Sequence, residues 1–154
     1  MIKIIPYDDS YKEGVICLIL NIWENEFNYK GLERPDIYNI PEFYQKDKNS
    51  NFWVALDDNK LVGTVGLINK DIGVANLKRM AVKKEFRNKG LGERLFEIVK
   101  KFAKEKGIKT IYAGMVPENV NAIKFYKKQG FIKNESIPEG LVISDNPVCL
   151  RLDL

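Results

Sequence analysis

Two glycines stand at a predicted helix start in the stretch EFRNKGLGERLF, residues 85–96. Glycine is a poor helix former, so Gly90 and Gly92 need a reason at this place. The first turn of a helix has unpaired backbone N–H groups and partial positive charge, and glycine leaves these donors accessible to a bulky anion. Arg87 and Lys89 add positive charge beside them. The stretch predicts a site for a phosphate or pyrophosphate, and the alternative is a plain chain turn with solvated basic residues.

Several kinds of chemistry are excluded by the residue types present. The chain has no histidine, which excludes a Ser-His-Asp triad and a Cys-His dyad and leaves Asp, Glu, Tyr, Lys, a chain end or water as a base. No acidic or thiol residues cluster at metal-ligand spacing, so we predict no metal. The phosphate pattern G-x-x-x-x-G-K-[ST] is absent, and Leu95 stands at the third glycine of the dinucleotide pattern G-x-G-x-x-G.

The composition is that of an ordinary globular domain. The 154 residues are 45% hydrophobic and 30% charged, so we expect a single domain over residues 1–154. A net charge of +4 gives a mild preference for anionic partners but no nucleic-acid-binding tail. No signal peptide and no run of ~20 apolar residues stands out, so we expect a cytoplasmic protein without a membrane partner. Cys17 and Cys149 lie far apart in apolar runs, and we expect two buried, unpaired thiols.

The apolar pattern predicts strands and helices in a mixed α/β order. We expect strands at 2–6, 52–58, 60–68, 74–82, 108–116, 131–137 and 148–154, with 52–68 forming an antiparallel hairpin. We expect helices at about 10–27 with a capping box of Ser10 and Glu13, at 35–44 with a bend at Pro41, at 90–106 and at 119–130. Apolar positions in 74–82 change parity between Leu77 and Met80, which predicts a β-bulge unless one alternation is misread.

Three segments together resemble one family. Arg87-Asn-Lys-Gly90-Leu-Gly92 resembles the R/Q-x-x-G-x-G/A loop of the GNAT superfamily of acyl-CoA-dependent N-acyltransferases. LKRMAV (77–82) is similar to the strand before that loop, and NVNAIKFYKKQGF (119–131) is similar to the family's N-x-x-A-x-x-x-Y-x-x-x-G-F segment. The resemblance covers roughly residues 51–135 and implies a mixed, largely antiparallel central sheet flanked by helices. It also implies transfer of an acetyl group from acetyl-CoA to a primary amine by direct attack in a ternary complex.

The resemblance implies a role for each matching residue. The coenzyme A pyrophosphate would bind backbone N–H groups of the loop, which comprises Arg87, Asn88, Lys89, Gly90, Leu91 and Gly92. The pantetheine arm would pair with the backbone of Met80, Ala81 and Val82, and Asn119 would bind it from the far side. Tyr126 would point at the sulfur. A tyrosine of pKa about 10 can protonate a departing thiolate of parent pKa about 8.5, and the alternative is that Tyr126 is only a core aromatic.

The acceptor side is less defined by the sequence. The acidic candidates for binding or deprotonating the acceptor lie in the first helices and loop and are Glu24, Glu26, Glu33 and Asp36. The alternative for each is that it is only a solvated surface charge. The family often places an acidic residue on the strand before the loop, but Asn76 stands in that region, which leaves the general base open. The stretch EFNYKGLERPDI resembles the acceptor side of small-molecule members, which implies a small-molecule amine as partner.

Two other functions stay open on the sequence alone. The acceptor could be an amine of a protein or peptide. The absence of an acid at Asn76 also fits a non-catalytic acyl-CoA-binding sensor. Because dimers are common in such folds, a homodimer is expected.

Overall fold

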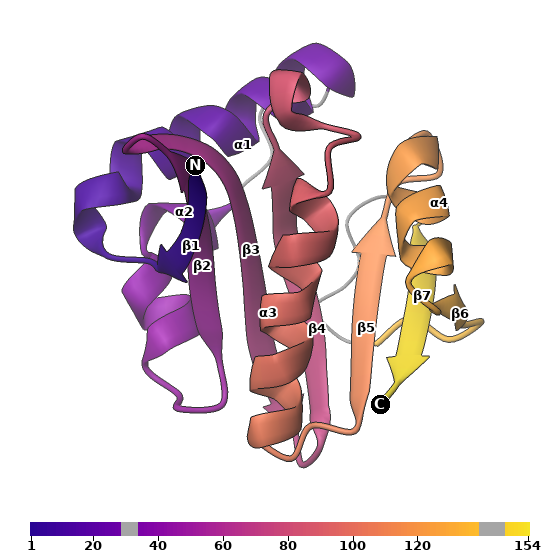
Figure 1. Cartoon of the computed structure of the whole chain (residues 1–154). Helices are drawn as coiled ribbons and strands as arrows, with labels where there is room; N and C mark the ends of the chain where they lie inside the picture. The colour runs from indigo at the N-terminus through magenta and orange to yellow at the C-terminus, as the bar shows by residue number, and fades with distance from the viewer. Residues whose placement is uncertain (29–33, 139–146) are drawn as a thin grey trace.

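The computed structural model describes residues 1–28, 34–138 and 147–154 (Figure 1). Its helices are α1 (Lys12–Glu26), α2 (Pro35–Tyr38), α3 (Leu91–Glu105) and α4 (Val120–Lys128), with short 3-10 turns η1 (Asp9–Tyr11) and η3 (Lys84–Phe86) and a π-helical turn η2 (Pro41–Gln45). Its strands are β1 (Ile2–Pro6), β2 (Asn51–Asp57), β3 (Lys60–Asp71), β4 (Val74–Val82), β5 (Thr110–Met115), β6 (Ile132–Lys133) and β7 (Val148–Asp153).

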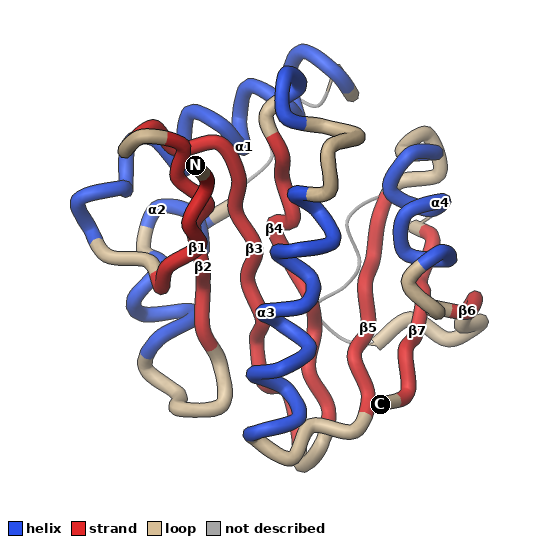
Figure 2. Tube along the Cα trace, viewed as in Figure 1, coloured by secondary structure: helices blue, strands red, loops and turns tan. Residues whose placement is uncertain are grey.

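The strands form a seven-stranded sheet in the order β1-β2-β3-β4-β5-β7-β6 (Figure 2). Every neighbouring pair is antiparallel except β4 and β5, which are parallel because α3 connects them as a crossover. The predicted fold class, a mixed and largely antiparallel sheet flanked by helices, is confirmed.

Helices cover both faces of this sheet. In Figure 1, α3 lies in front of β3 and β4, whereas α1 and α2 lie behind the sheet. The core on the α3 face contains the buried positions of that helix, which are Leu91, Leu95, Phe96, Val99 and Ala103. The core on the opposite face contains Val15, Ile19, Ile37, Ile40 and Tyr44 from α1, α2, and η2 with its N-cap residue. Full burial of one such apolar side chain contributes roughly 1.5–3 kcal/mol, so the apolar stripe of α3 fixes its orientation on the sheet.

The predicted bulge in β4 is present. The β3–β4 register changes from Gly66 opposite Lys78 to Thr64 opposite Ala81, so two β4 residues oppose one β3 residue. The bulged residue Arg79 has a left-handed φ of 55°, and the Thr64 hydroxyl donates to its carbonyl at 2.8 Å. After the bulge, Met80 packs on the α3 face and Ala81 on the opposite face.

Strands β4 and β5 separate partway along their length. Their pairing runs from Val74 opposite Thr110 to Leu77 opposite Ala113 and stops there. The second half of β4 therefore has its outer edge turned away from any described strand, directly before the loop that leads into α3. This separation positions the site described below.

Several local expectations were wrong. The capping box of Ser10 and Glu13 does not form, because Ser10 lies in η1 and donates its N–H to Asp8 at 2.8 Å, while α1 begins at Lys12. Cys17 is exposed rather than buried, since the buried face of α1 is formed by Val15, Leu18 and Ile19, and only Cys149 is a buried thiol.

The other element predictions differ mainly in length. The helix expected at 35–44 is split into α2 and η2 around Pro41, as the predicted bend requires. The strand expected at 131–137 keeps only two residues, Ile132 and Lys133. No helix in the described part of the chain is long and apolar enough to cross a membrane.

Candidate active site

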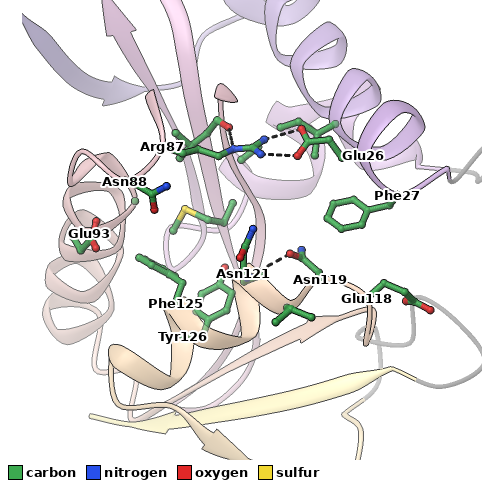
Figure 3. A pocket seen from close by; sticks show the side chains of 17 residues that line it. Glu26, Phe27, Arg87, Asn88, Glu93, Glu118, Asn119, Asn121, Phe125 and Tyr126 are labelled. Carbon is green, nitrogen blue, oxygen red and sulfur yellow. Dashed lines mark hydrogen bonds and ion pairs between the residues drawn. The ribbon is translucent and has the colours of Figure 1, made fainter. Parts of the chain in front are cut away.

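A cleft of about 460 Å³ opens where β4 leaves β5 (Figure 3). Its walls come from the end of α1, the second half of β4, the start of α3 and the start of α4. Of the predicted cofactor residues, those that line the cleft are Met80, Ala81, Val82, Arg87, Asn88, Gly92, Asn119 and Tyr126. Lys89, Gly90 and Leu91 do not line it: Lys89 and Gly90 are exposed, and Leu91 is buried in the core.

The loop before α3 owes its shape to two left-handed residues. Asn88 has φ of 59° and Gly90 has φ of 86°, and Gly90 is the N-cap residue of α3. A side chain at Gly90 would meet nothing within 4 Å, so its backbone conformation is the reason for glycine there. The first helical hydrogen bond runs from Arg94 N–H to the Gly90 carbonyl at 3.1 Å. The backbone N–H groups that precede Arg94 at the start of α3 therefore have no acceptor within the helix, so they are available to bind an anion.

Gly92 has a different structural reason from Gly90. A Cβ on Gly92 would lie 3.2 Å from the Phe125 ring, so the missing side chain lets α4 approach the first turn of α3. From the sequence, both glycines were expected to clear space for the anion. The structure assigns Gly92 to helix packing at the wall of the cleft.

Arg87 and Glu26 form an ion pair at the rim of the cleft. The guanidinium of Arg87 donates to both carboxylate oxygens of Glu26 at 2.5 and 2.7 Å, and its Nε donates to the Val82 carbonyl at 2.8 Å (Figure 3). The hydrogen bonds to Glu26 raise the pKa of Arg87. Glu26 was an acceptor-side candidate, but the structure places it beside the predicted cofactor loop. The ion pair joins the end of α1 to that loop.

Tyr126 and Asn119 both belong to α4 or its cap. Tyr126 is 5% exposed and packs edge-on against Phe125 and Phe131, each at 5.2 Å between ring centroids. Burial raises the pKa of Tyr126 well above its usual range, so its hydroxyl stays protonated at neutral pH. Asn119 Oδ1 accepts from the Ala122 N–H at 3.2 Å and caps the helix, as an asparagine at this position favours.

A second, smaller cavity of about 90 Å³ lies on the far side of these residues. It shares Met80, Asn119, Ala122 and Tyr126 with the cleft. Its other lining residues are Trp23 from α1, Leu77, Lys78 and Arg79 from β4, and Ala113, Gly114 and Met115 from β5. The separation of β4 from β5 thus brings two cavities together at Met80 and Tyr126, an arrangement suited to two substrates that react with each other.

The acidic acceptor candidates do not gather at this cavity. Asp36 is 5% exposed and binds Arg79, whose Nε and Nη2 donate to its two oxygens at 2.8 and 2.7 Å. The Tyr44 hydroxyl donates to the same carboxylate at 2.6 Å. Burial opposes the charge of Asp36, but the hydrogen bonds from Arg79 outweigh it and hold the pKa of Asp36 below its usual range. The alternative of a solvated surface charge is therefore wrong for Asp36.

The remaining candidates lie apart from one another. Glu24 is exposed on α1, and Asn76 is 1% exposed within β4. Glu33 lies outside the described residues. In the described part of the chain, no group of three or more His, Cys, Asp or Glu residues is placed to hold a metal ion.

The structure also brings in residues that the sequence analysis did not single out. In the cleft these are Ile22, Phe27, Glu93, Glu118, Val120, Asn121, Ala122 and Phe125. Phe125 precedes Tyr126 within the recognised segment, so its place in the sequence was a usable signal. Lys78 likewise lies within segment 77–82, which resembles the family's strand, whereas Trp23 lies on an apolar helix stripe and carried no such signal.

The fold and the site agree on a class of protein. A crossover helix with an open, glycine-containing start beside a separated pair of parallel strands fits the N-acyltransferases that the sequence resemblance implies. The model of the acetyltransferase (GNAT) family matches residues 17–131, well over half of the chain. The chain belongs to this family and carries its acetyltransferase domain.

Curated relatives and solved structures agree with this assignment. N-acetylaspartate synthetase of Xenopus tropicalis is 34% identical over 99 residues, which cover 64% of this chain and 36% of that protein. Human N-acetyltransferase 8B is 30% identical over 105 residues, which cover 65% of this chain and 46% of that protein. The chain thus spans less than half the length of these two relatives.

Two solved structures extend the comparison to nearly the whole chain. A GNAT-family acetyltransferase from Staphylococcus aureus Mu50 superposes with a TM-score of 0.90 at 36% identity and covers 99% of both chains. PaiA N-acetyltransferase from Thermoplasma acidophilum, in complex with coenzyme A, superposes with a TM-score of 0.83 at 20% identity, over 100% of this chain and 99% of that one. The second likeness concerns the fold alone.

Proposed function

We propose that this chain transfers an acetyl group from acetyl-CoA to a primary amine of a small molecule, by direct attack within a ternary complex. The observation that carries the proposal is the meeting of the large cleft and the small cavity at Met80 and Tyr126. The small volume of the second cavity, about 90 Å³ between described residues, favours a small molecule over a folded protein as acceptor. The acetyltransferase family to which the chain belongs supports acetyl-CoA as the donor.

In this proposal the chain holds coenzyme A at two places. The pyrophosphate binds amide groups between Arg87 and Gly92, where the start of α3 provides partial positive charge. The pantetheine arm lies along β4 and pairs with the backbone of Met80 and Val82, at the edge that β5 leaves open. Asn119 uses Oδ1 for its helix cap, so its Nδ2 serves the arm.

The chain's own groups then assist the transfer. A backbone N–H of the Met80–Val82 segment stabilises the negative charge that develops on the thioester oxygen. Tyr126, kept protonated by burial, donates its proton to the departing thiolate. Asp36 is held by Arg79 and Tyr44, so it does not serve as the base, and water at the small cavity takes the proton of the amine. Residues 1–154 act as a single domain in this proposal, and a cytoplasmic homodimer stays a prediction.

Calorimetry and a thiol-release assay test this function. We expect acetyl-CoA and CoA to bind at micromolar concentrations, and we expect thiol release above background hydrolysis with at least one class among amino acids, polyamines, aminoglycosides and peptides. Absence of acetyl-CoA binding would refute the proposal. Binding without thiol release from any amine would support the non-catalytic sensor, and turnover of peptides alone would support a protein or peptide acceptor.

A further inference from the structure

Two basic side chains line the small cavity between β4 and β5, and a third lies against Trp23 in its wall. Lys78 and Arg79 line it, and Trp23 forms another part of its wall. Arg34 lies over the Trp23 ring, with its guanidinium carbon 4.7 Å from the ring centroid. Arg34 is only 7% exposed, which is unusual for an arginine. The cavity therefore has two cations in its wall and a buried third behind Trp23.

Only one of these cations is neutralised by a described carboxylate. Arg79 binds both oxygens of Asp36, and the Tyr44 hydroxyl occupies the same carboxylate. Neither Arg34 nor Lys78 forms an ion pair within residues 1–28, 34–138 and 147–154.

The guanidinium of Arg34 also has an unused donor. Its Nη2 is fully buried and has no hydrogen-bond partner among the described residues. A buried donor without a partner is costly and is rare in folded proteins. Burial and the neighbouring charge of Arg79 lower the pKa of both Arg34 and Lys78. Asp36 attracts both cations and Glu24 attracts Arg34, but neither carboxylate forms an ion pair with them. An anionic group at the cavity would offset the repulsion between these cations and Arg79.

We propose that the acceptor amine carries a carboxylate, which binds Lys78 in the cavity and is attracted by the charge of Arg34 behind Trp23, while the amine group meets the thioester at Met80 and Tyr126. This inference rests on the proposed function and narrows its acceptor to amino acids and similar carboxylate-bearing amines. Arginine and lysine are the usual partners of carboxylates, and a buried pair is screened little by salt. Polyamines and aminoglycosides bring further positive charge to a cavity that already holds an excess of it.

The first test compares acceptors that differ in the carboxylate alone. Thiol release from acetyl-CoA is measured with L-aspartate, L-glutamate and L-alanine, with the corresponding carboxamides, and with spermidine. We expect kcat/KM for at least one amino acid to exceed that of its carboxamide by tenfold or more, with spermidine the poorest substrate. Equal or faster turnover of the carboxamides or spermidine would overturn the inference and leave the proposed function standing.

A second readout does not depend on turnover. Succinate, a carboxylate without an amine, is titrated calorimetrically into the protein saturated with CoA. We expect succinate to bind, and to bind at least tenfold more weakly to Lys78→Gln. If no amine is acetylated but succinate binds in this way, the proposed function fails and the carboxylate site remains. If succinate does not bind and no amino acid is preferred over its amide, the site is refuted.

Variants locate the effect at the cavity. We expect Lys78→Gln to raise KM for the preferred amino acid at least tenfold and Arg34→Gln to raise it by a smaller factor, with kcat changed less than threefold and CoA affinity unchanged in both. Lys101→Gln, which removes an exposed positive charge from α3, is the matched control and should change neither constant. Because Arg34 is buried, thermal unfolding is used to check that Arg34→Gln is folded. If it is not folded, Lys78→Gln is the deciding variant, since Lys78 is only half-buried. An unchanged KM in Lys78→Gln would contradict the inference.

Discussion

Substituting alanine for Gly90 tests whether coenzyme A binding depends on the backbone conformation of the loop before α3. Gly90 has φ of 86° and open space around its Cα, so alanine there introduces backbone strain without a steric clash. Forcing a residue with a side chain into the left-handed region costs roughly 1–2 kcal/mol. For a chain of this size that cost corresponds to a decrease of about 2–8 °C in Tm.

The same chain contains a matched control. Gly107, which follows the last turn of α3, has φ of 74°, and a Cβ added there would also meet nothing within 4 Å. We therefore expect Gly90→Ala and Gly107→Ala to lose similar amounts of stability. Only Gly90 lies in the loop predicted to hold the pyrophosphate, so only its variant should bind coenzyme A more weakly.

The expected loss of affinity follows from the hydrogen bonds at stake. One hydrogen bond to a charged group contributes about 1.5–3 kcal/mol, and every 1.4 kcal/mol is a tenfold change in Kd. A shift of the loop amides that loses one such bond should weaken CoA binding by at least tenfold. Calorimetry below the Tm of both variants gives Kd, and thermal unfolding gives the stability. Equal Kd values for Gly90→Ala and Gly107→Ala would refute the assignment of the loop to the pyrophosphate.

Three further variants address single contacts. Tyr126→Phe should lower the single-turnover rate at least tenfold with acetyl-CoA affinity within about twofold, because general acid catalysis contributes about 10²–10⁴-fold; a wild-type rate would mean that another group protonates the thiolate. Glu26→Gln should strengthen CoA binding by up to about fivefold, because it releases Arg87 from an ion pair worth about 0–1 kcal/mol, whereas weaker binding would make the pair part of the site. Asp36→Asn should lower the free energy of unfolding by about 3–5 kcal/mol, because it leaves Arg79 buried and uncompensated. The pKa of Asp36 is lower in the folded state than in the unfolded state. Its contribution to the free energy of unfolding is therefore present above its unfolded pKa of about 3.9 and is lost as pH falls below that value. Urea unfolding measured on both sides of that pH should show a smaller pH dependence in Asp36→Asn than in the wild type.

The loop and its flanking elements were predictable because their signals are local. Helix α3 follows from apolar spacing and its two end glycines, and the open start follows from Gly90 alone. The bulge followed from a change of parity between Leu77 and Met80, since a strand changes faces only when a residue is inserted. In each case the residues that carry the signal lie within about one element of the feature that they predict.

The charged contacts were not predictable because they join distant parts of the chain. Arg79 meets Asp36 across 43 positions, and Arg87 meets Glu26 across 61. A sequence shows that an acidic residue exists, but its partner depends on how α1 and α2 lie on the sheet. Asp36 looked like a surface charge for this reason, since its two partners, Tyr44 and Arg79, come from η2 and β4.

The bulge in β4 decides which groups meet at the candidate active site. Without it, strict alternation would place Arg79 and Ala81 on the same face as Leu77. With it, Met80 and Val82 pack toward α3, while Arg79 reaches Asp36 beside α2 on the other face. Since β5 pairs with β4 only as far as Leu77, the backbone after the bulge keeps one edge open to the cleft. The inserted residue thus lies just beyond the point where the edge proposed for the cofactor arm opens, and it sends a cation to the cavity proposed for the acceptor, so both halves of the proposed site meet at a single local feature of one strand.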